Sequence, residues 1–432
     1  MKADKNILRQ LNKKNIYRNP YRKRRFSTKV FVVLFAVLLL GALLLFLTLF
    51  LDLPFFSDIE MNPSEQNPAT ADTVTEFVIA SEAVTAPVAV PEIYMFDTAP
   101  APDLPVYQGF FDLPLNGATG WVAVYSVIRN APDMAAEVIF AMPGGTPFTI
   151  IREQGSFWYI RLTDGSYGYI PHSRAFINLP DILPSMIFYI SNATASVKRS
   201  GGWFLPGITG YALYNAYSFN PRLDRYEFIV PSLYSSAVML AQAHRNAIEN
   251  GDIIILYEAF RPMEAQTMVR DALSDLIYAN SSVANTINFG GWHVGWFISQ
   301  DISDHQRGAA FDVHLARILE TESVYIGDFT FTRITNYARY PMISNIHELS
   351  PAAAIVTAPV NLSFSQWQEM TLPAHNTEGG LRLFNYMVEA GFMPIASEWW
   401  HFTDQAGNVA AAGINVTGNF FTETIFSEVP YG

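Results

Sequence analysis

Residues 303–312, with the sequence SDHQRGAAFD, set a histidine seven positions before an aspartate. Gly308 and two alanines lie between His305 and Asp312, so the chain between them can pack tightly. The pattern has two interpretations: a metal site of nitrogen and oxygen ligands, or a chance arrangement on a turn and the strand after it. The chain contains no cysteine. Thiolate ligands and thiol nucleophiles are therefore excluded, and His, Asp and Glu remain as strong metal ligands.

A second segment, SEWWHF at residues 397–402, offers the further ligand that such a site needs. A catalytic zinc takes three protein ligands and keeps one position open, and His401 is the candidate for the third. Glu398, three residues earlier, is a candidate general base that takes a proton from water. In a regular strand these two positions face opposite sides. The metal interpretation therefore requires a bulge or a strong twist; otherwise the segment is an ordinary aromatic strand.

The sequence around these segments alternates between helical and strand patterns. It predicts an α+β domain with a central antiparallel sheet over residues 179–432. Arg261 lies where a predicted strand meets a helix whose first residue is Pro262, a junction from which side chains commonly point into a cleft. His314 follows Asp312 by two residues and is predicted to be a core or supporting histidine, not a ligand. The predicted elements are helices at 235–251, 261–279 and 379–392 and strands at 252–260 and 393–404.

Residues 118–178 have a different pattern. Short alternating runs are separated by Gly, Pro and Asp-Gly turns, which is typical of a small all-β barrel. The runs VIRNAP, GTPFTII, WYIRL and GYI resemble the bacterial SH3-like domain in their order. Domains of that family often bind cell-wall peptide or serve as spacers. Trp158 is predicted to be a core residue, whereas Phe157 and Tyr167 belong either to the core or to a ligand platform.

Charge divides the chain into a basic start and an acidic remainder. Residues 1–29 carry eleven Lys or Arg and one acid, a net charge of +10, and the other 403 residues carry a net charge of −22. Residues 30–51 form a run of 22 residues without a charge. As a helix this run spans roughly 33 Å, enough to cross a bilayer. A buried core helix is the alternative interpretation.

Basic residues before an apolar span favour a cytoplasmic N-terminus. We therefore expect a single-pass cell-membrane protein with a cytoplasmic tail at 1–29, a transmembrane helix at 30–51 in the lipid bilayer, and residues 52–432 outside the cytoplasm. The basic tail is then a topology signal, and no nucleic-acid partner is expected. Residues 52–117 are rich in Pro, Ala, Thr and acids and are predicted to form an extended stalk.

Three segments together resemble the family of zinc D-alanyl-D-alanine dipeptidases and D,D-carboxypeptidases, which includes the dipeptidase of vancomycin resistance. EAFRP, SDHQRGAAFDV and SEWWHF occur in the family's order and at similar separations. The resemblance implies an α+β zinc peptidase domain with one Zn²⁺ per chain. The implied roles are zinc ligation by His305, Asp312 and His401, general base and acid catalysis by Glu398, polarisation of the scissile carbonyl by Arg261, and a substrate contact by Ser303.

One segment departs from the vancomycin-resistance dipeptidase. That enzyme has an acidic residue that binds the free amino group of its dipeptide. The matching segment here, MISNIHELS at 342–350, has His347 at that position and Glu348 beside it, which implies a substrate-binding role for these two residues. We expect a D,D-carboxypeptidase that hydrolyses D-Ala-D-Ala bonds of peptidoglycan stem peptides. Two alternatives stay open: a dipeptidase for free D-Ala-D-Ala, and a non-catalytic cell-wall-binding protein.

Overall fold

The computed structural model of the chain describes residues 107–373 and 376–431. The predicted cytoplasmic tail, the predicted transmembrane helix and most of the predicted stalk, residues 1–106, lie outside the described residues. Within the described ranges, no helix has both the length and the apolar composition needed to cross a membrane.

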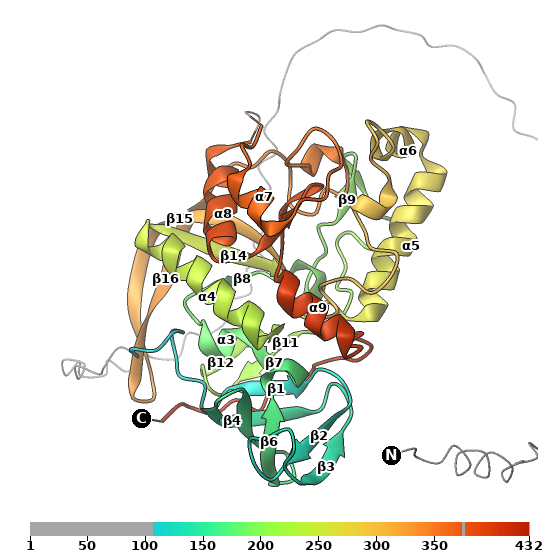
Figure 1. Cartoon of the computed structure of the whole chain (residues 1–432). Coiled ribbons are helices and arrows are strands. Elements are labelled where there is room, and N and C mark those ends of the chain that lie inside the picture. The colour runs from blue at the N-terminus through green and yellow to red at the C-terminus, as the bar shows by residue number, and fades with distance from the viewer. Residues whose placement is uncertain (1–106, 374–375, 432) are drawn as a thin grey trace, which may run out of the picture. The chain divides into compact units, whose positions relative to one another are not determined.

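The region predicted to be a small β-barrel supplies seven strands of an eight-stranded antiparallel sheet (Figure 1). Successive residues of a strand point to opposite faces, and one face of this sheet is a core that contains Phe148, Trp158 and Ile170. The prediction that Trp158 is a core residue is confirmed; Phe157 is also buried, and Tyr167 is exposed. In sheet order the strands are β13 (Pro231–Leu233), β7 (Ala175–Asn178), β1 (Thr119–Val122), β4 (Pro147–Gln154), β5 (Phe157–Leu162), β6 (Tyr167–Pro171), β2 (Ser126–Arg129) and β3 (Val138–Met142).

A second, mostly antiparallel sheet carries the candidate site. Its central strand β15 pairs with β14 on one side and with β18 on the other, and β8 runs parallel to β14. The strand predicted at 393–404 is two strands, because the chain turns at Ala396 and Ser397. In sheet order the strands are β17 (Met393–Ile395), β18 (Glu398–Thr403), β15 (Ala310–Ile326), β14 (Asp252–Glu258) and β8 (Ile187–Phe188), and β16 (Phe329–Arg339) pairs with β15.

Helices pack on this second sheet and extend beyond it (Figure 1). In α4 the buried residues recur every three or four positions, which is the spacing that places Leu240, His244 and Ala247 on one face. Pro262 is the N-cap of α5 and not its first helical residue, because its ψ of 149° is not helical. The helices are α3 (Leu179–Ile182), α4 (Tyr234–Glu249), α5 (Met263–Ala279), α6 (Ser281–Ile287), α7 (Phe364–Glu369), α8 (Glu378–Glu389) and α9 (Gln405–Gly413).

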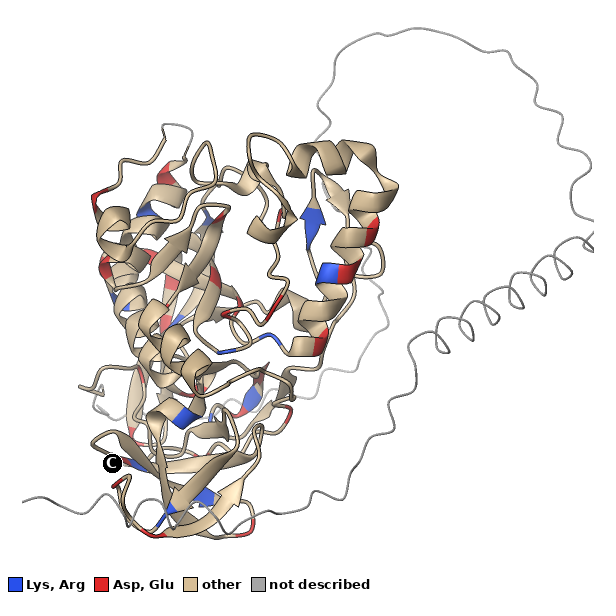
Figure 2. Cartoon of the chain, turned by 45° about the vertical axis from the view of Figure 1, so that its right-hand side comes forward, with Lys and Arg blue, Asp and Glu red and all other residues tan. Residues whose placement is uncertain are grey.

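Charged residues are scattered over both sheets and the helices (Figure 2). Two short hairpins complete the described strands. One hairpin consists of β9 (Arg199–Ser200) and β10 (Trp203–Phe204), the other of β11 (Tyr217–Asn220) and β12 (Arg225–Phe228).

The domains predicted at 118–178 and 179–432 are joined through shared hydrogen bonds. Strand β13 comes from the second of them and extends the first sheet by pairing with β7. Near the C-terminus the chain returns to that sheet, where the hydroxyls of Thr119 and Ser427 are 2.7 Å apart. Both regions consequently belong to one unit, Met95–Gly432. An edge strand satisfies its backbone groups by such pairing, which is why the sequence boundary at residue 178 does not separate two bodies.

The last residues of the predicted stalk also belong to the folded unit. Phe111, Leu113 and Leu115 are buried, and the carboxylate of Asp112 accepts a hydrogen bond from the backbone N–H of Ser185 at 2.9 Å. Three apolar side chains can be buried only if this segment packs against the folded domain, and their burial is favourable. Residues 107–117 therefore do not form an extended stalk.

Candidate metal centre

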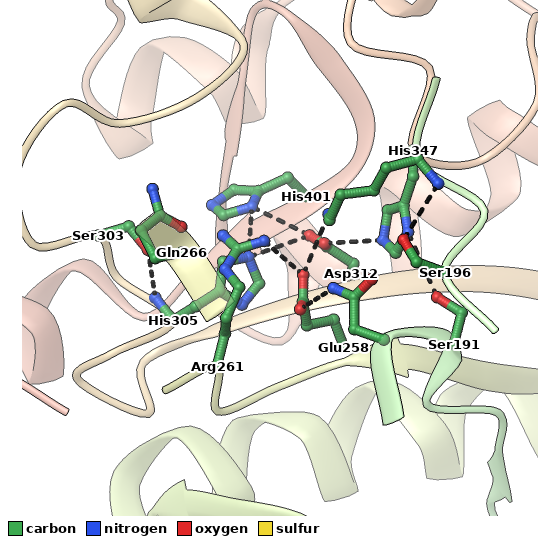
Figure 3. A network of polar contacts seen from close by, with 12 residues as sticks. Ser191, Ser196, Glu258, Arg261, Gln266, Ser303, His305, Asp312, His347 and His401 are labelled. Carbon is green, nitrogen blue, oxygen red and sulfur yellow. Dashed lines mark hydrogen bonds and ion pairs between the residues drawn. The ribbon is translucent and has the colours of Figure 1, made fainter. Parts of the chain in front are cut away.

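Two neighbouring strands and the turn before one of them bring the predicted ligands together. Asp312 of β15 lies directly opposite His401 of β18 and, on its other side, opposite Glu258 of β14. Opposite residues of an antiparallel pair place their side chains on the same face of the sheet. His305 lies in the turn before β15, and its ring meets the side chains of Asp312 and His401 (Figure 3).

The atoms that face one another are nitrogen and oxygen atoms with the spacing of metal ligands. Nε2 of His305 lies 3.2 Å from Nδ1 of His401 and 3.3 Å from Oδ1 of Asp312. Nδ1 of His401 lies 3.1 Å from the same oxygen. Ligand bonds of about 2.0–2.1 Å in a tetrahedral zinc site correspond to ligand separations of roughly 3.3 Å. The three atoms therefore fit one face of such a tetrahedron.

The outer nitrogen of each histidine is hydrogen-bonded, which fixes the proton on that side. Nδ1 of His305 lies 2.7 Å from the carbonyl oxygen of Ala259, which can only accept. Nε2 of His401 lies 3.1 Å from the Thr403 hydroxyl, and this hydroxyl donates in turn to Asp304. Both outer nitrogens thus carry protons, and both inner nitrogens keep the lone pair that a metal requires. Partners of this kind orient the ligands of metal sites.

His347 and Glu348 do not take the substrate-binding positions that the sequence predicted. His347 is wholly buried, and its Nε2 lies 3.0 Å from Oδ2 of Asp312. Its backbone has φ 60°, an uncommon conformation for a residue other than glycine. Glu348 accepts hydrogen bonds from the backbone N–H groups of Gly201 and Gly202. Within the described chain the cavity lining includes Leu349 but neither of these two residues. The structure places His347 behind Asp312, as a support for the candidate ligand.

Histidines control the charge of the Asp312 carboxylate. Burial raises its pKa, but the electrostatic interaction with His305 and the polar contacts with His305, His347 and His401 outweigh burial and hold the pKa of Asp312 well below its usual range. The same contacts act on His401: burial lowers its pKa, the Asp312 carboxylate raises it, and the net shift is upward. Asp312 is consequently an anion, as ligation of a cation requires.

Glu398 combines a cavity position with a nearly neutral pKa. Its Oε2 lies 3.8 Å from Nδ1 of His401. Burial raises the pKa of Glu398 to about 7, although the electrostatic interaction with His401 opposes this shift. Both residues face the cavity because Glu398 is the first residue after the β17–β18 turn, where the register shifts between Pro394 and Ile395. The irregular strand that the metal interpretation requires is therefore present.

A cavity of about 480 Å³ contains the candidate site. Its lining includes every predicted ligand together with Arg261, Ser303 and Glu398. Ser303 is also part of the turn that presents His305, because its hydroxyl accepts a hydrogen bond from the His305 backbone N–H at 3.3 Å. The lining further includes Lys198, His293, Trp296, Asp304 and Trp400, which the sequence analysis had not assigned to the site.

A buried ion cluster borders the candidate ligands (Figure 3). Glu258 contacts Nη1 of Arg261 at 2.6 Å and Nζ of Lys198 at 3.4 Å. Burial raises the pKa of Glu258, but the charges of Arg261 and Lys198 lower it by more. The net shift of the pKa is downward, so the carboxylate is ionised. Glu258 is also near Asp312 and His347 in a second arrangement with ligand-like spacing. Two cations already neutralise Glu258, which makes that second arrangement unfavourable for a metal ion.

His314 lies outside the ligand group, as predicted. Its ring packs edge-on against Trp399 at a centroid distance of 5.3 Å, and its Nδ1 lies 2.9 Å from the carbonyl oxygen of Leu315. Burial lowers the pKa of His314 to about 4. It is therefore a neutral core residue beside the site.

The comparisons with known proteins identify one part of the chain. Residues 126–177 match the family model of the bacterial SH3 domain, which confirms the SH3-like region predicted between residues 118 and 178. A search of curated proteins gives no match to the chain. The SH3 match covers strands β2 to β6 and most of β7, and it does not extend to the candidate metal centre.

Proposed function

We propose that this protein is a zinc-dependent peptidase that removes the terminal D-Ala from peptides ending in D-Ala-D-Ala. The observation that carries the proposal is the convergence of three inward-facing ligand atoms and the Glu398 carboxylate on one cavity. The motif resemblance described above supplies the substrate class. The bacterial SH3 domain at residues 126–177 supports action at the cell wall, because such domains often bind wall components.

The donor set fits zinc, with Nε2 of His305, Nδ1 of His401 and Oδ1 of Asp312 as its ligands. Zinc in such a site supplies a Lewis acid and makes bound water more acidic. The ligand set consists of two neutral histidines and one carboxylate, and their hydrogen-bond partners hold them in this state.

Proton transfer is the task of Glu398. Its carboxylate takes a proton from the water that attacks the scissile carbonyl carbon. The same proton then passes to the leaving amino group as the carbon–nitrogen bond breaks, so that the products are the shortened peptide and free D-Ala. A pKa of about 7 suits a group that must both accept and give up a proton near neutral pH.

Arg261 stabilises the negative charge that develops on the carbonyl oxygen. Its guanidinium borders the cavity and is only 4 % exposed. Its Nε is buried without a hydrogen-bond partner among the described residues, and an unpaired donor of this kind is costly unless a ligand uses it. A hydrogen bond that strengthens as charge develops lowers the barrier.

The position of His347 favours a stem peptide over the free dipeptide. At the position where the related dipeptidase has its amine-binding acid, His347 is buried against Asp312 and does not reach the cavity. A stem peptide has an amide there and needs no ammonium partner. Asp304 keeps the dipeptidase as a second candidate, because its carboxylate lines the cavity and can bind an ammonium group.

A competition experiment tests the proposal. The zinc-loaded full chain in detergent receives equal amounts of a pentapeptide stem ending in D-Ala-D-Ala and of free D-Ala-D-Ala, and each product is quantified by mass spectrometry. We expect the larger kcat/KM for the stem peptide and no turnover by Glu398→Gln. A larger kcat/KM for the dipeptide identifies the dipeptidase. No turnover of either compound by the wild type rejects a D-Ala-D-Ala peptidase and favours the non-catalytic wall-binding alternative.

A further inference from the structure

Lys198 is the single lysine between residues 30 and 432, a region that otherwise uses fifteen arginines for its positive charge. A lone lysine is normally a solvated surface residue. Here the side chain is 2 % exposed and lines the same cavity as Arg261 and the candidate metal ligands. The one lysine of the folded region is therefore buried beside the reaction centre.

Lys198 shares its ion-pair partner with Arg261. Among the described residues, Glu258 is the ion-pair partner of both Lys198 and Arg261, so one carboxylate faces two cations. Its contact with Arg261 is short, 2.6 Å, and its other oxygen accepts a hydrogen bond from Asn192. The contact with Lys198 is long, 3.4 Å. Glu258 is thus satisfied without Lys198. The nearby Asp312 carboxylate contacts His305, His347 and His401, so among the described residues no second carboxylate pairs with Lys198.

A buried charge that is only weakly paired is unfavourable. A protein retains such a group most readily where a ligand of opposite charge arrives to pair with it. An ammonium has three donors, and the long contact to Glu258 leaves donors available to a bound anion. The ligand that best fits Lys198 therefore carries a negative charge close to the Arg261 guanidinium, which contacts the same carboxylate.

We propose that Lys198 binds the free carboxylate at the C-terminus of the substrate and thereby restricts cleavage to the last peptide bond. The inference rests on the proposed function and deepens it. In a peptide ending in D-Ala-D-Ala, the scissile carbonyl and the terminal carboxylate are separated by a single residue. Lys198 and Arg261 contact the same oxygen of Glu258, so the two cations are neighbours, with one available to each of these two substrate groups.

The test compares two forms of one peptide: an N-acetylated tripeptide that ends in D-Ala-D-Ala with a free carboxylate, and the same peptide with a C-terminal carboxamide. For the zinc-loaded full chain we expect kcat/KM for the acid to exceed that for the amide by at least about tenfold, and by up to about 100-fold. These factors follow from the strength of hydrogen bonds to charged groups. Lys198→Met should lose this factor on the acid, chiefly through KM, and should change little on the amide.

Arg199→Met is the matched control, because it removes one positive charge from the adjacent residue. Its guanidinium lies over the ring of Phe204 at 5.2 Å and does not line the cavity. This variant should keep the preference for the acid. A loss of preference in Arg199→Met equal to that in Lys198→Met would indicate a long-range charge effect and overturn the assignment.

A binding measurement separates this inference from the proposed function. Calorimetric titration of the Glu398→Gln full chain with the acid and the amide reports carboxylate recognition without turnover. Tighter binding of the acid, lost in Glu398→Gln/Lys198→Met, supports the assignment even if the wild type proves inactive. Equal affinity for acid and amide in the Glu398→Gln protein overturns it even if the wild type is active, and this comparison does not require the Lys198 variant to fold.

Discussion

Nε2 of His347 lies 3.0 Å from Oδ2 of Asp312, and this contact leaves Oδ1 of the aspartate facing His305 and His401. A carboxylate held in this way presents one oxygen only, which fixes its direction of ligation. His347 has a left-handed backbone with φ 60°, which is uncommon for a residue other than glycine. The contact of its side chain with Asp312 offsets the cost of this conformation.

Replacement of His347 by Ala should therefore weaken zinc binding by about 10- to 100-fold, the usual effect of losing an outer partner of a ligand. The measurement is competition for zinc against a chromophoric chelator. Ser191→Ala removes only the long, 3.5 Å contact to Nδ1 of His347 and should have a much smaller effect. Unchanged zinc affinity in His347→Ala would show that Asp312 does not depend on this support.

Replacement of a candidate ligand should remove the metal, whereas replacement of Glu398 should not. We expect His305→Ala and His401→Ala to lose zinc, because each removes one of three inward-facing donors. Glu398→Gln should keep about one zinc per chain and lose turnover by about 10²–10⁴-fold, the usual effect of losing a general base. Metal analysis of the purified full chains decides this, and full zinc occupancy in both histidine variants contradicts the ligand assignment.

Gly308 joins the site to the SH3-like sheet and should not tolerate a side chain. It has φ +67°, and a Cβ there would lie 2.7 Å from the Phe176 ring and 3.2 Å from the backbone nitrogen of Leu233. Gly308→Ala combines backbone strain of roughly 1–3 kcal/mol with this clash, and it displaces the turn that carries His305. We expect a lower thermal unfolding temperature together with weaker zinc binding.

The matched control is Gly155→Ala. Gly155 has φ +60° with nothing within 4 Å of the added Cβ, so only the backbone strain applies. Equal destabilisation by the two substitutions would show that contact with the SH3-like sheet does not constrain residue 308.

His244 should make stability depend on pH below neutrality. It is buried in α4, its Nε2 lies 2.8 Å from the Ser185 hydroxyl, and burial lowers its pKa from 6.5 to about 4. The unfolded chain binds a proton more readily than the folded chain, so stability is fully present above about pH 6.5 and is lost as the pH falls toward 4. The shift corresponds to about 3 kcal/mol in all, of which roughly 2 kcal/mol is lost by pH 5.

Urea unfolding of the wild type and of His244→Gln at about pH 7.5 and about pH 5 measures this effect. Both proteins share all other titrating groups, so the difference between them isolates His244. The variant should lose less stability between the two pH values. Parallel losses in the two proteins would show that His244 does not contribute.

The membrane topology expected from the sequence can be tested in intact cells that produce the chain. The +10 charge of residues 1–29 before the apolar run at 30–51 predicts a protected N-terminal tail. External protease should therefore digest the C-terminal region and leave the tail. A C-terminal region that stays intact until the cells are lysed would place it in the cytoplasm and remove the cell-wall substrate.

Local patterns in the sequence were sufficient for much of the fold. The helix over 235–251 and the buried strand over 252–260 follow from periodicity, and both are present as α4 and β14. The alternating runs of residues 118–178 were sufficient to recognise the SH3-like region. These features depend on residues close together in the chain, where spacing determines which side chains share a face.

Prediction of the candidate site required both the sequence and the tertiary structure. The sequence determined which residue types were available, and two short motifs contained His305, Asp312 and His401. Only the tertiary structure showed that the β17–β18 turn puts Glu398 on the same side as His401. A strand pattern by itself placed these two residues on opposite faces.

Other features were decided by the tertiary structure alone. His347 was predicted to touch substrate and is instead buried against Asp312, and Lys198 gave no motif although it was the only lysine after residue 29. Lys198 meets Glu258 across sixty residues of sequence, and β13 joins a sheet that the sequence assigned to another domain. Contacts between distant segments depend on strand register and on the burial of charge. Strand register and the burial of charge are set by the packing of the whole chain, so they cannot be predicted from residue spacing within one segment.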